Sequence, residues 1–200
     1  MLKTAVIGGS GYIGSHLLNK YREEFPDCIG TTFSKKIPHL KSFDITKGRV
    51  EKLGLIEIES FLVEEAISTL STMADRLMPS VPVHDNPAKE LALSLQGKLI
   101  AVYGGGILSG VARRWKTQFN ENAKSWALLE LFPEAGHNAI AGIKWPSSVS
   151  QNSYGIILDS HILHDGMRIR YEVVRELLND VQAHCQVVHG MGTGVLSQML

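Results

Sequence analysis

The chain has 200 residues, of which 44% are hydrophobic and 20% charged, and its formal net charge is zero. This composition is sufficient to bury a core in one large domain or two small ones, and it offers no excess positive charge for nucleic acid. Two cysteines, Cys28 and Cys185, suit a reduced cytoplasmic protein better than a disulfide scaffold. The apolar run over residues 1–7 is too short for a signal peptide, and no stretch reaches the length of a membrane span.

Charge is distributed unevenly along the chain. Residues 1–50 carry eight Lys/Arg and four Asp/Glu, whereas residues 51–200 carry twelve and sixteen. The balance therefore changes from +4 to −4 near residue 50. This change predicts two domains, residues 1–50 and residues 51–200.

The first domain begins with a strand, a glycine-rich turn and a helix. Residues 4–7 and 28–33 are typical of short buried strands, and a helical pattern runs over residues 12–24. Gly8, Gly11 and Gly14 lie between the first strand and the helix. Glycine permits a tight turn and the close approach of a phosphate, and the helix N-terminus attracts an anion. The pattern predicts a partial Rossmann βαβ unit, with a purely structural turn as the equal alternative.

The glycine spacing over about residues 1–48 resembles that of the extended short-chain dehydrogenase/reductase family. By that resemblance, Lys35 and Lys36 after the second strand imply a preference for NADP, and residues 43–46 correspond to the end of a third strand. That family also needs a Tyr followed four residues later by a Lys, and no Tyr in this sequence has a Lys at that spacing. The resemblance therefore implies NAD(P) binding at most, without hydride transfer.

The second domain alternates strands and helices. Helical patterns cover residues 61–77, 87–95, 107–124 and 167–182, with a final helical start over 194–200. Asn86 is placed to cap the second helix, with Pro87 in its first turn. Apolar runs over 98–103, 155–159 and 186–188 predict strands. The alternation predicts an α/β fold whose parallel sheet is flanked by helices. Residues 104–106 are interpreted as a sharp turn, or alternatively as a loop lining a ligand site.

The helix over residues 107–124 has two distinct stripes. Arg114, Thr117 and Glu121 form a polar one, because steps of three and four stay on one face. Glu121 lies near the helix C-terminus, where the helix dipole disfavours a carboxylate. This carboxylate is therefore either solvated or has a functional role. From the pattern alone, Glu121 and His137 are most simply ordinary surface residues. The other stripe is apolar and consists of Leu108, Val111, Trp115 and Phe119.

Six segments spread over about residues 51–198 resemble the C-terminal sugar-isomerase (SIS) half of bifunctional phosphoglucose/phosphomannose isomerases. They are KLGLIE, VEEAISTL, MADRLMPSVP, NPAKELA, RWKTQFNENAK and FPEAGHN. The resemblance implies that Glu121 is the catalytic base and that His137 assists ring opening. It also implies that Arg114 and Asn120 contact the substrate, that neither metal nor cofactor is required, and that a homodimer builds the site at its subunit junction.

The implied reaction converts glucose 6-phosphate or mannose 6-phosphate into fructose 6-phosphate through an enediolate. The family's phosphate-binding loop and a catalytic arginine lie in its first SIS half, so the chain alone is expected to turn over little substrate. Arg113, Arg114 and Lys144 are candidates for the cationic roles. Two alternatives remain: an NAD(P)-binding sugar-nucleotide reductase fragment and a non-catalytic phosphosugar-binding module.

Overall fold

The computed structural model describes residues 5–6, 29–32, 40–42 and 58–200. The chain divides into two units, Met1–Glu59 and Ser60–Leu200. In the first, β1 (Ala5–Val6), β2 (Ile29–Thr32) and β3 (Leu40–Ser42) form a parallel sheet in that order. β1 and β2 lie within the predicted strands, and β3 directly precedes the predicted third one. Gly8, Gly11, Gly14, the helix over 12–24 and the lysines after β2 lie outside the described residues.

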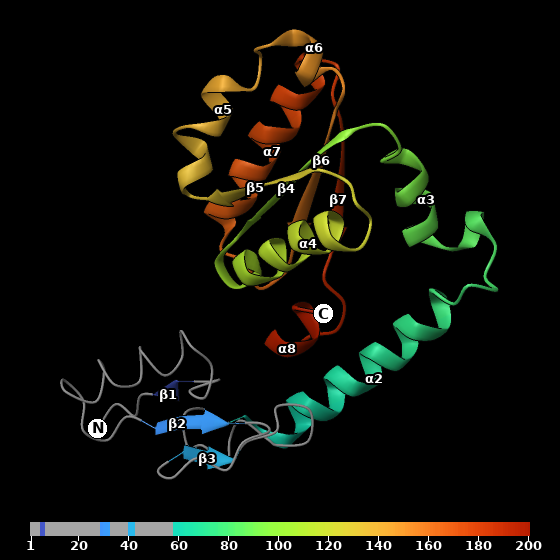
Figure 1. The fold of residues 1–200 in the computed structure, drawn as a ribbon, viewed down its shortest axis with the longest axis vertical. Helices are drawn as coiled ribbons and strands as arrows, with labels where there is room; N and C mark the ends of the chain where they lie inside the picture. The colour runs from blue at the N-terminus through green and yellow to red at the C-terminus, as the bar shows by residue number, and fades with distance from the viewer. Residues whose placement is uncertain (1–4, 7–28, 33–39, 43–57) are drawn as a thin grey trace. The chain divides into compact units, whose positions relative to one another are not determined.

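The second unit is built on a four-stranded parallel sheet (Figure 1). Its strands are β4 (Leu99–Gly105), β5 (Ala127–Phe132), β6 (Ser153–Asp159) and β7 (His184–His189), in the order β5-β4-β6-β7. The first strand of this unit is central: Val102 of β4 pairs with Leu129 on one side and Ile156 on the other. The parallel sheet flanked by helices confirms the predicted α/β class.

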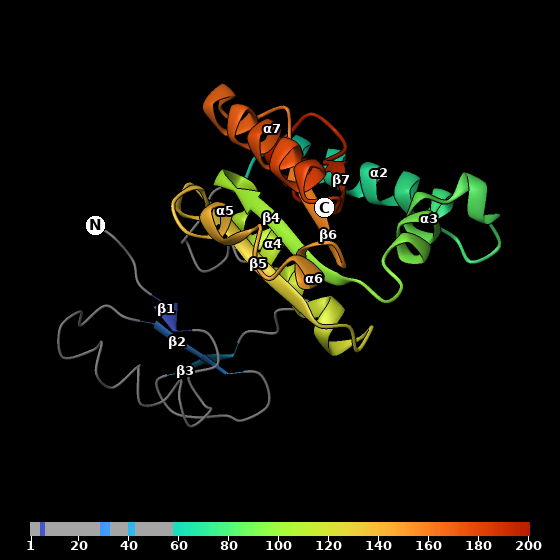
Figure 2. The same ribbon diagram turned by 90° about the horizontal axis from the view of Figure 1, so that it is seen from above.

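Helices cover both faces of this sheet (Figures 1 and 2). α4 (Ser109–Glu121) connects β4 to β5, and α7 (Asp165–Asp180) connects β6 to β7. The connections from β4 to β5 and from β6 to β7 run in opposite directions along the sheet, so right-handed crossovers place α4 on one face and α7 on the other. The short helices α5 (Ala139–Gly142) and α6 (Ser147–Ser150) precede β6 and lie on the α7 face.

The core lies between the sheet and these helices. The central strands β4 and β6 are buried on both faces and therefore appear in the sequence as nearly continuous apolar runs, whereas the edge strands β5 and β7 are mostly half-buried. The predicted stripe on α4 packs against this core, with Leu108 buried and Val111, Trp115 and Phe119 partly buried. The largest apolar side chains with less than 2% exposure come from β4, β6 and α7: Ile100, Val102, Ile156, Ile157, Val174 and Leu178.

Three further helices precede or follow the sheet. α2 (Ser60–Arg76) has no fully buried residue and packs against α8 (Val195–Gln198), and α3 (Pro87–Ser94) leads into β4. The buried Asn86 accepts a hydrogen bond from Lys89 N at 3.2 Å, which confirms the predicted cap. Within the described part of the chain, no helix has the length and apolar character needed to cross a membrane.

Two features of the sheet differ from the sequence-based expectation. β5 was not predicted, and the interpretation of residues 104–106 as a turn was wrong for Gly104 and Gly105, which are buried residues of β4. A Cβ on Gly104 would lie 2.6 Å from Ala112 Cβ, and one on Gly105 would lie 2.8 Å from the Met167 side chain. These glycines therefore let α4 and α7 pack closely on β4. The turn begins at Gly106, whose φ is +54°.

Candidate active site

Glu121 is the last residue of α4, and its side chain is exposed. α4 runs back along β4, so it ends at the amino edge of the sheet, just before β5 begins. The Lys124 ammonium donates to the Glu121 backbone carbonyl, which satisfies one carbonyl of the last helical turn. The Glu121 carboxylate itself has no hydrogen-bond partner among the described residues. A cavity of about 310 Å³ near the same end of α4 is lined by Trp115, Gln118, Phe119, Asn122 and Ala123, but not by Glu121.

The two predicted substrate contacts, Arg114 and Asn120, lie on the same helix as Glu121. Arg114 is exposed, and the Gln118 amide, with its oxygen turned toward it, accepts from its Nε at 2.9 Å. Asn120 Oδ1 accepts from the backbone N–H of Ala127 at 2.9 Å. Asn120 thus joins the end of α4 to the start of β5, and only its NH₂ group is left for a ligand.

His137 follows β5 at the opposite edge of the sheet. The short 3-10 helix η4 (Glu134–Gly136) starts just after β5, and the backbone N–H of His137 donates to Glu134 O at 2.8 Å to close it. The His137 imidazole is exposed. It lines a cavity of about 250 Å³ together with Pro133, Gly136, Ile140, Ile169, Arg170 and Val173.

The fold of one chain does not bring Glu121 and His137 together. Glu121 precedes β5 and His137 follows it, so the full six-residue strand lies between them. At ~3.3 Å per residue this corresponds to roughly 20 Å. Neither of the two cavities described above is lined by both side chains. Within one chain, the two residues therefore do not share a site.

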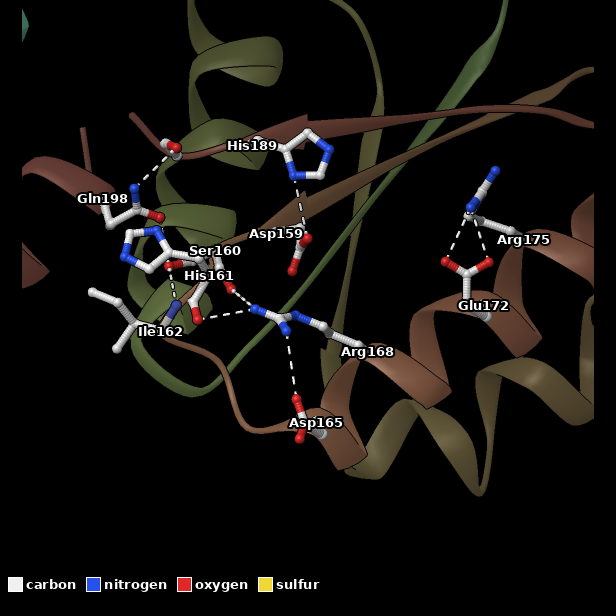
Figure 3. Close-up of polar contacts among 11 residues, drawn as sticks. Asp159, Ser160, His161, Ile162, Asp165, Arg168, Glu172, Arg175, His189 and Gln198 are labelled. Atoms are coloured by element: carbon white, nitrogen blue, oxygen red, sulfur yellow. Dashed lines mark hydrogen bonds and ion pairs between the residues drawn. The ribbon is translucent and has the colours of Figure 1, made fainter. Parts of the chain in front are cut away.

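A polar network occupies the carboxyl edge at β6 and β7 (Figure 3). His189 Nδ1 lies 3.2 Å from Asp159 Oδ2, and the buried Ser160 hydroxyl donates to Gln198 Oε1 at 2.6 Å. Arg168 Nη2 donates to the His161 carbonyl at 2.9 Å. These side chains satisfy one another, although Asp159 Oδ1 is buried without a partner among the described residues. No group of three or more His, Cys, Asp or Glu residues in residues 58–200 is placed to hold a metal ion.

Several ionisable groups beside the sheet have displaced pKa values. Burial raises the pKa of the Glu130 carboxyl in β5 and of the Cys185 thiol in β7. Burial is also the main cause that raises the pKa of the Tyr171 hydroxyl, and nearby Asp159 raises it further. In contrast, the backbone N–H and hydroxyl of Thr193 lower the pKa of Glu65 on α2. None of the four belongs to the predicted catalytic set; burial is the main cause for three of them, and hydrogen bonds are the main cause for Glu65.

Comparison with known proteins identifies the domain. Residues 84–200 match the family described as the bacterial phospho-glucose isomerase C-terminal SIS domain. The chain belongs to this family. A bifunctional phosphoglucose/phosphomannose isomerase of Caldicellulosiruptor bescii is 34% identical over 149 residues, which is 74% of this chain and 44% of that protein. One from Aquifex aeolicus is 26% identical over 148 residues, again 74% of this chain and 44% of the relative.

The fold of this SIS-domain protein also has a counterpart of known structure. A glucose-6-phosphate isomerase-like protein from Thermus thermophilus superposes with a TM-score of 0.65 at 18% identity. The match covers 86% of this chain and 58% of that one. At 18% identity, this likeness shows a shared fold. The chain spans less than half the length of the two isomerase relatives named above.

The sequence reasoning missed three polar residues that the SIS fold places at its carboxyl edge. Asp159 and His189 end β6 and β7, and Arg170 lines the cavity with His137. Asp159 had a readable signal, because it directly follows a buried apolar run and carboxyl ends of parallel strands gather polar groups. No signal in the sequence distinguishes Arg170, because α7 contains three arginines within eight residues.

Proposed function

We propose that this chain supplies the C-terminal SIS half of a cytoplasmic phosphosugar isomerase that converts glucose 6-phosphate or mannose 6-phosphate into fructose 6-phosphate. In this proposal Glu121 is the base and His137 the ring-opening acid. Family membership carries the proposal, because the relatives that share this SIS domain are named phosphoglucose/phosphomannose isomerases.

The chemistry needs one carboxylate and one proton shuttle. Glu121 would remove the proton from the carbon beside the carbonyl, and return it one carbon away after the enediolate forms. His137 would protonate the ring oxygen of the cyclic sugar while the hydroxyl proton leaves, which opens the ring; imidazole titrates in the range for this role. The enediolate loses the configuration at C2, so one site serves both aldose phosphates.

We further propose that the working site is shared by two copies of the chain. The separation of Glu121 and His137 by the length of β5 supports this arrangement. Large exposed apolar side chains lie near each position, with Trp126 73% exposed in the segment after Glu121 and Ile169 66% exposed beside the His137 cavity. Such exposed apolar surface is typical of a contact face. In a symmetric dimer, Glu121 of each copy would face His137 of the other.

Turnover by this chain alone is expected to be slow. Isomerisation also needs a phosphate anchor and a group that stabilises the enediolate, and binding energy at the phosphate positions the sugar. Loss of one well-placed stabilising group typically costs about 10²–10³ in rate.

The assay should therefore accumulate product: fructose 6-phosphate is incubated with the protein in D₂O, and deuterium at C1 or C2 is followed by NMR. Exchange abolished by Glu121→Gln but kept in Glu90→Gln, an exposed control acid, is the expected result.

A mixing experiment tests the shared site. Glu121→Gln and His137→Asn should each abolish exchange, and their mixture should recover about a quarter of wild-type exchange, since half the dimers contain one intact site. If the mixture stays inactive while a dimer is present, the site is not shared between chains.

A non-catalytic phosphosugar-binding module is the second candidate, and the distance between Glu121 and His137 in one chain favours it for the monomer. Binding of fructose 6-phosphate without deuterium exchange would select it.

For the first unit we propose weak NAD(P) binding at Gly8, Gly11 and Gly14, supported by the parallel order β1-β2-β3. Submicromolar NADPH affinity with turnover of a carbonyl substrate would instead favour a reductase fragment.

A further inference from the structure

The C-terminal end of α4 must be held in place if Glu121 is to act as a base. A misplacement of about 1 Å can cost ~100-fold in the rate of an enzymatic reaction. Glu121 is the last residue of its helix, and its side chain is exposed. Helix ends tend to fray, because their last carbonyls have no partner within the helix. The contacts that fix this helix end therefore determine whether Glu121 has a defined position.

The first peptide group of β5 provides a fixed point beside this helix end. Ile100 N donates to Trp126 O at 3.4 Å, so the carbonyl of the peptide unit between Trp126 and Ala127 points toward β4. In a trans peptide the N–H points the opposite way, and here it points away from β4. Ala127 is 1% exposed, so this N–H belongs to backbone that is anchored in the core. It lies on the side of β5 where the four-stranded sheet ends.

Asn120 provides the acceptor for this N–H. Its Oδ1 lies 2.9 Å from Ala127 N, which ties the residue before Glu121 to the core. The chain after Glu121 is bonded back to α4 as well: Ser125 N donates to Phe119 O at 3.1 Å, and the Lys124 ammonium donates to the Glu121 carbonyl. Lys124 has a φ of +54°, a left-handed conformation that is uncommon for a residue with a side chain. The short reversal from α4 to β5 is thus fixed on both sides of Glu121.

We propose that Asn120 is a positioning residue for Glu121, acting through the backbone of Ala127 rather than by contact with the substrate. The role of Glu121 as the base rests on the proposed function. A side-chain amide has an acceptor end and a donor end, and the acceptor end is the one engaged at Ala127. The resemblance implied a substrate contact for Asn120, whereas this geometry gives its acceptor the task of holding the catalytic carboxylate in place.

Two substitutions at Asn120 separate the two ends of the amide. Asn120→Asp keeps an oxygen acceptor and loses the NH₂ group, whereas Asn120→Ala loses both. At the pH optimum of each variant, Asn120→Asp should keep most of the wild-type deuterium exchange into fructose 6-phosphate, and Asn120→Ala should lose about ten-fold or more. Asn122→Ala is the matched control, because this exposed amide on the other side of Glu121 contacts Gln118 instead of β5. It should leave the exchange unchanged.

NMR and calorimetry test the positioning without turnover. In Asn120→Ala the amide hydrogen of Ala127 should exchange faster with solvent, and the backbone order parameter of Glu121 should fall from about 0.85 toward 0.6. Asn120→Asp and Asn122→Ala should match wild type in both measurements. The affinity for fructose 6-phosphate, measured by calorimetry, should be the same in all variants, because the substitution displaces the base and removes no contact with the sugar.

The outcomes distinguish this proposal from the isomerase proposal. An equal loss of sugar exchange in Asn120→Asp and Asn120→Ala would show that the NH₂ group contacts the substrate and would overturn the positioning role. An unchanged order parameter of Glu121 in Asn120→Ala would also overturn it. If the NMR changes occur while the wild-type chain exchanges no deuterium into the sugar, Asn120 positions Glu121 and the isomerase is rejected. Circular dichroism checks folding, and Asn120→Gln, which displaces the acceptor by one methylene group, replaces Asn120→Ala if the latter does not fold.

Discussion

The two halves of the carboxyl edge of the sheet are built differently. Beyond β6 and β7, polar side chains bond one another: Gln198 accepts from Ser160 and donates to Gly190 O at 3.0 Å. Beyond β5, the exposed His137 and Arg170 line an open cavity, and the His137 side chain makes no hydrogen bond within residues 58–200. Buried polar groups that satisfy each other stabilise a fold, whereas exposed groups without such partners contribute little to it. The comparison therefore predicts that the β6–β7 side contributes more to stability than the β5 side.

The largest expected effect is the loss of Gln198. Its side chain is 3% exposed and joins the Ser160 hydroxyl to the loop after β7. Gln198→Ala leaves the buried Ser160 hydroxyl without its acceptor and the part-buried Gly190 and Gly192 carbonyls without their donor, and should lower the free energy of unfolding by about 2–4 kcal/mol. Urea denaturation measures this, with Gln96→Ala as an exposed control. A loss below half a kcal/mol would mean that the network does not stabilise the β6–β7 side.

The contact between α2 and the C-terminal segment should depend on pH. Glu65 accepts from the Thr193 hydroxyl at 2.8 Å and from the backbone N–H groups of Thr193 and Gly194. These bonds lower its pKa below the ordinary value of 4.5. Its stabilising contribution is therefore complete above pH 4.5 and is lost as the pH falls through the depressed folded-state value.

Glu65→Gln should accordingly be less stable than wild type at neutral pH, and the difference should shrink as the pH falls below 4.5. Urea denaturation at several pH values measures it, and Glu64→Gln, an exposed neighbour on α2, is the control. A difference between Glu65→Gln and wild type that stays constant as the pH falls from neutral through the acid range would contradict the role of the carboxylate charge.

The smallest effect is expected on the β5 side. His137→Ala removes an exposed imidazole that makes no side-chain hydrogen bond within residues 58–200. It should change the free energy of unfolding by less than about 0.5 kcal/mol while abolishing deuterium exchange into fructose 6-phosphate, the proposed reaction. Thermal denaturation and the exchange assay measure the two effects separately. Destabilisation comparable to that of Gln198→Ala would show that both sides of the edge are structural.

Local patterns in the sequence were sufficient where local forces decide the structure. The cap at Asn86, the stripe on α4 and the apolar runs of β4, β6 and β7 were all readable, since capping and amphipathic periodicity act within a few residues. β5 was missed because it is an edge strand whose sequence, ALLELF, contains an acid and is only partly buried. Gly104 and Gly105 were misassigned because glycine is needed there for the close approach of Ala112 and Met167 from the two helices packed on β4, which is a tertiary contact.

Sequence patterns and motif resemblance were enough to predict the family and the parallel α/β class, and they indicated Glu121 and His137 as candidates. Where those two residues lie depends on the tertiary structure. A strand that runs the depth of the sheet places Glu121 and His137 at opposite edges, although they are close in sequence. The same sheet brings Arg170 to His137, because β5 and α7 meet through Phe132 and Tyr171. Proximity in a parallel sheet depends on which strand ends share an edge, and no local pattern records that order.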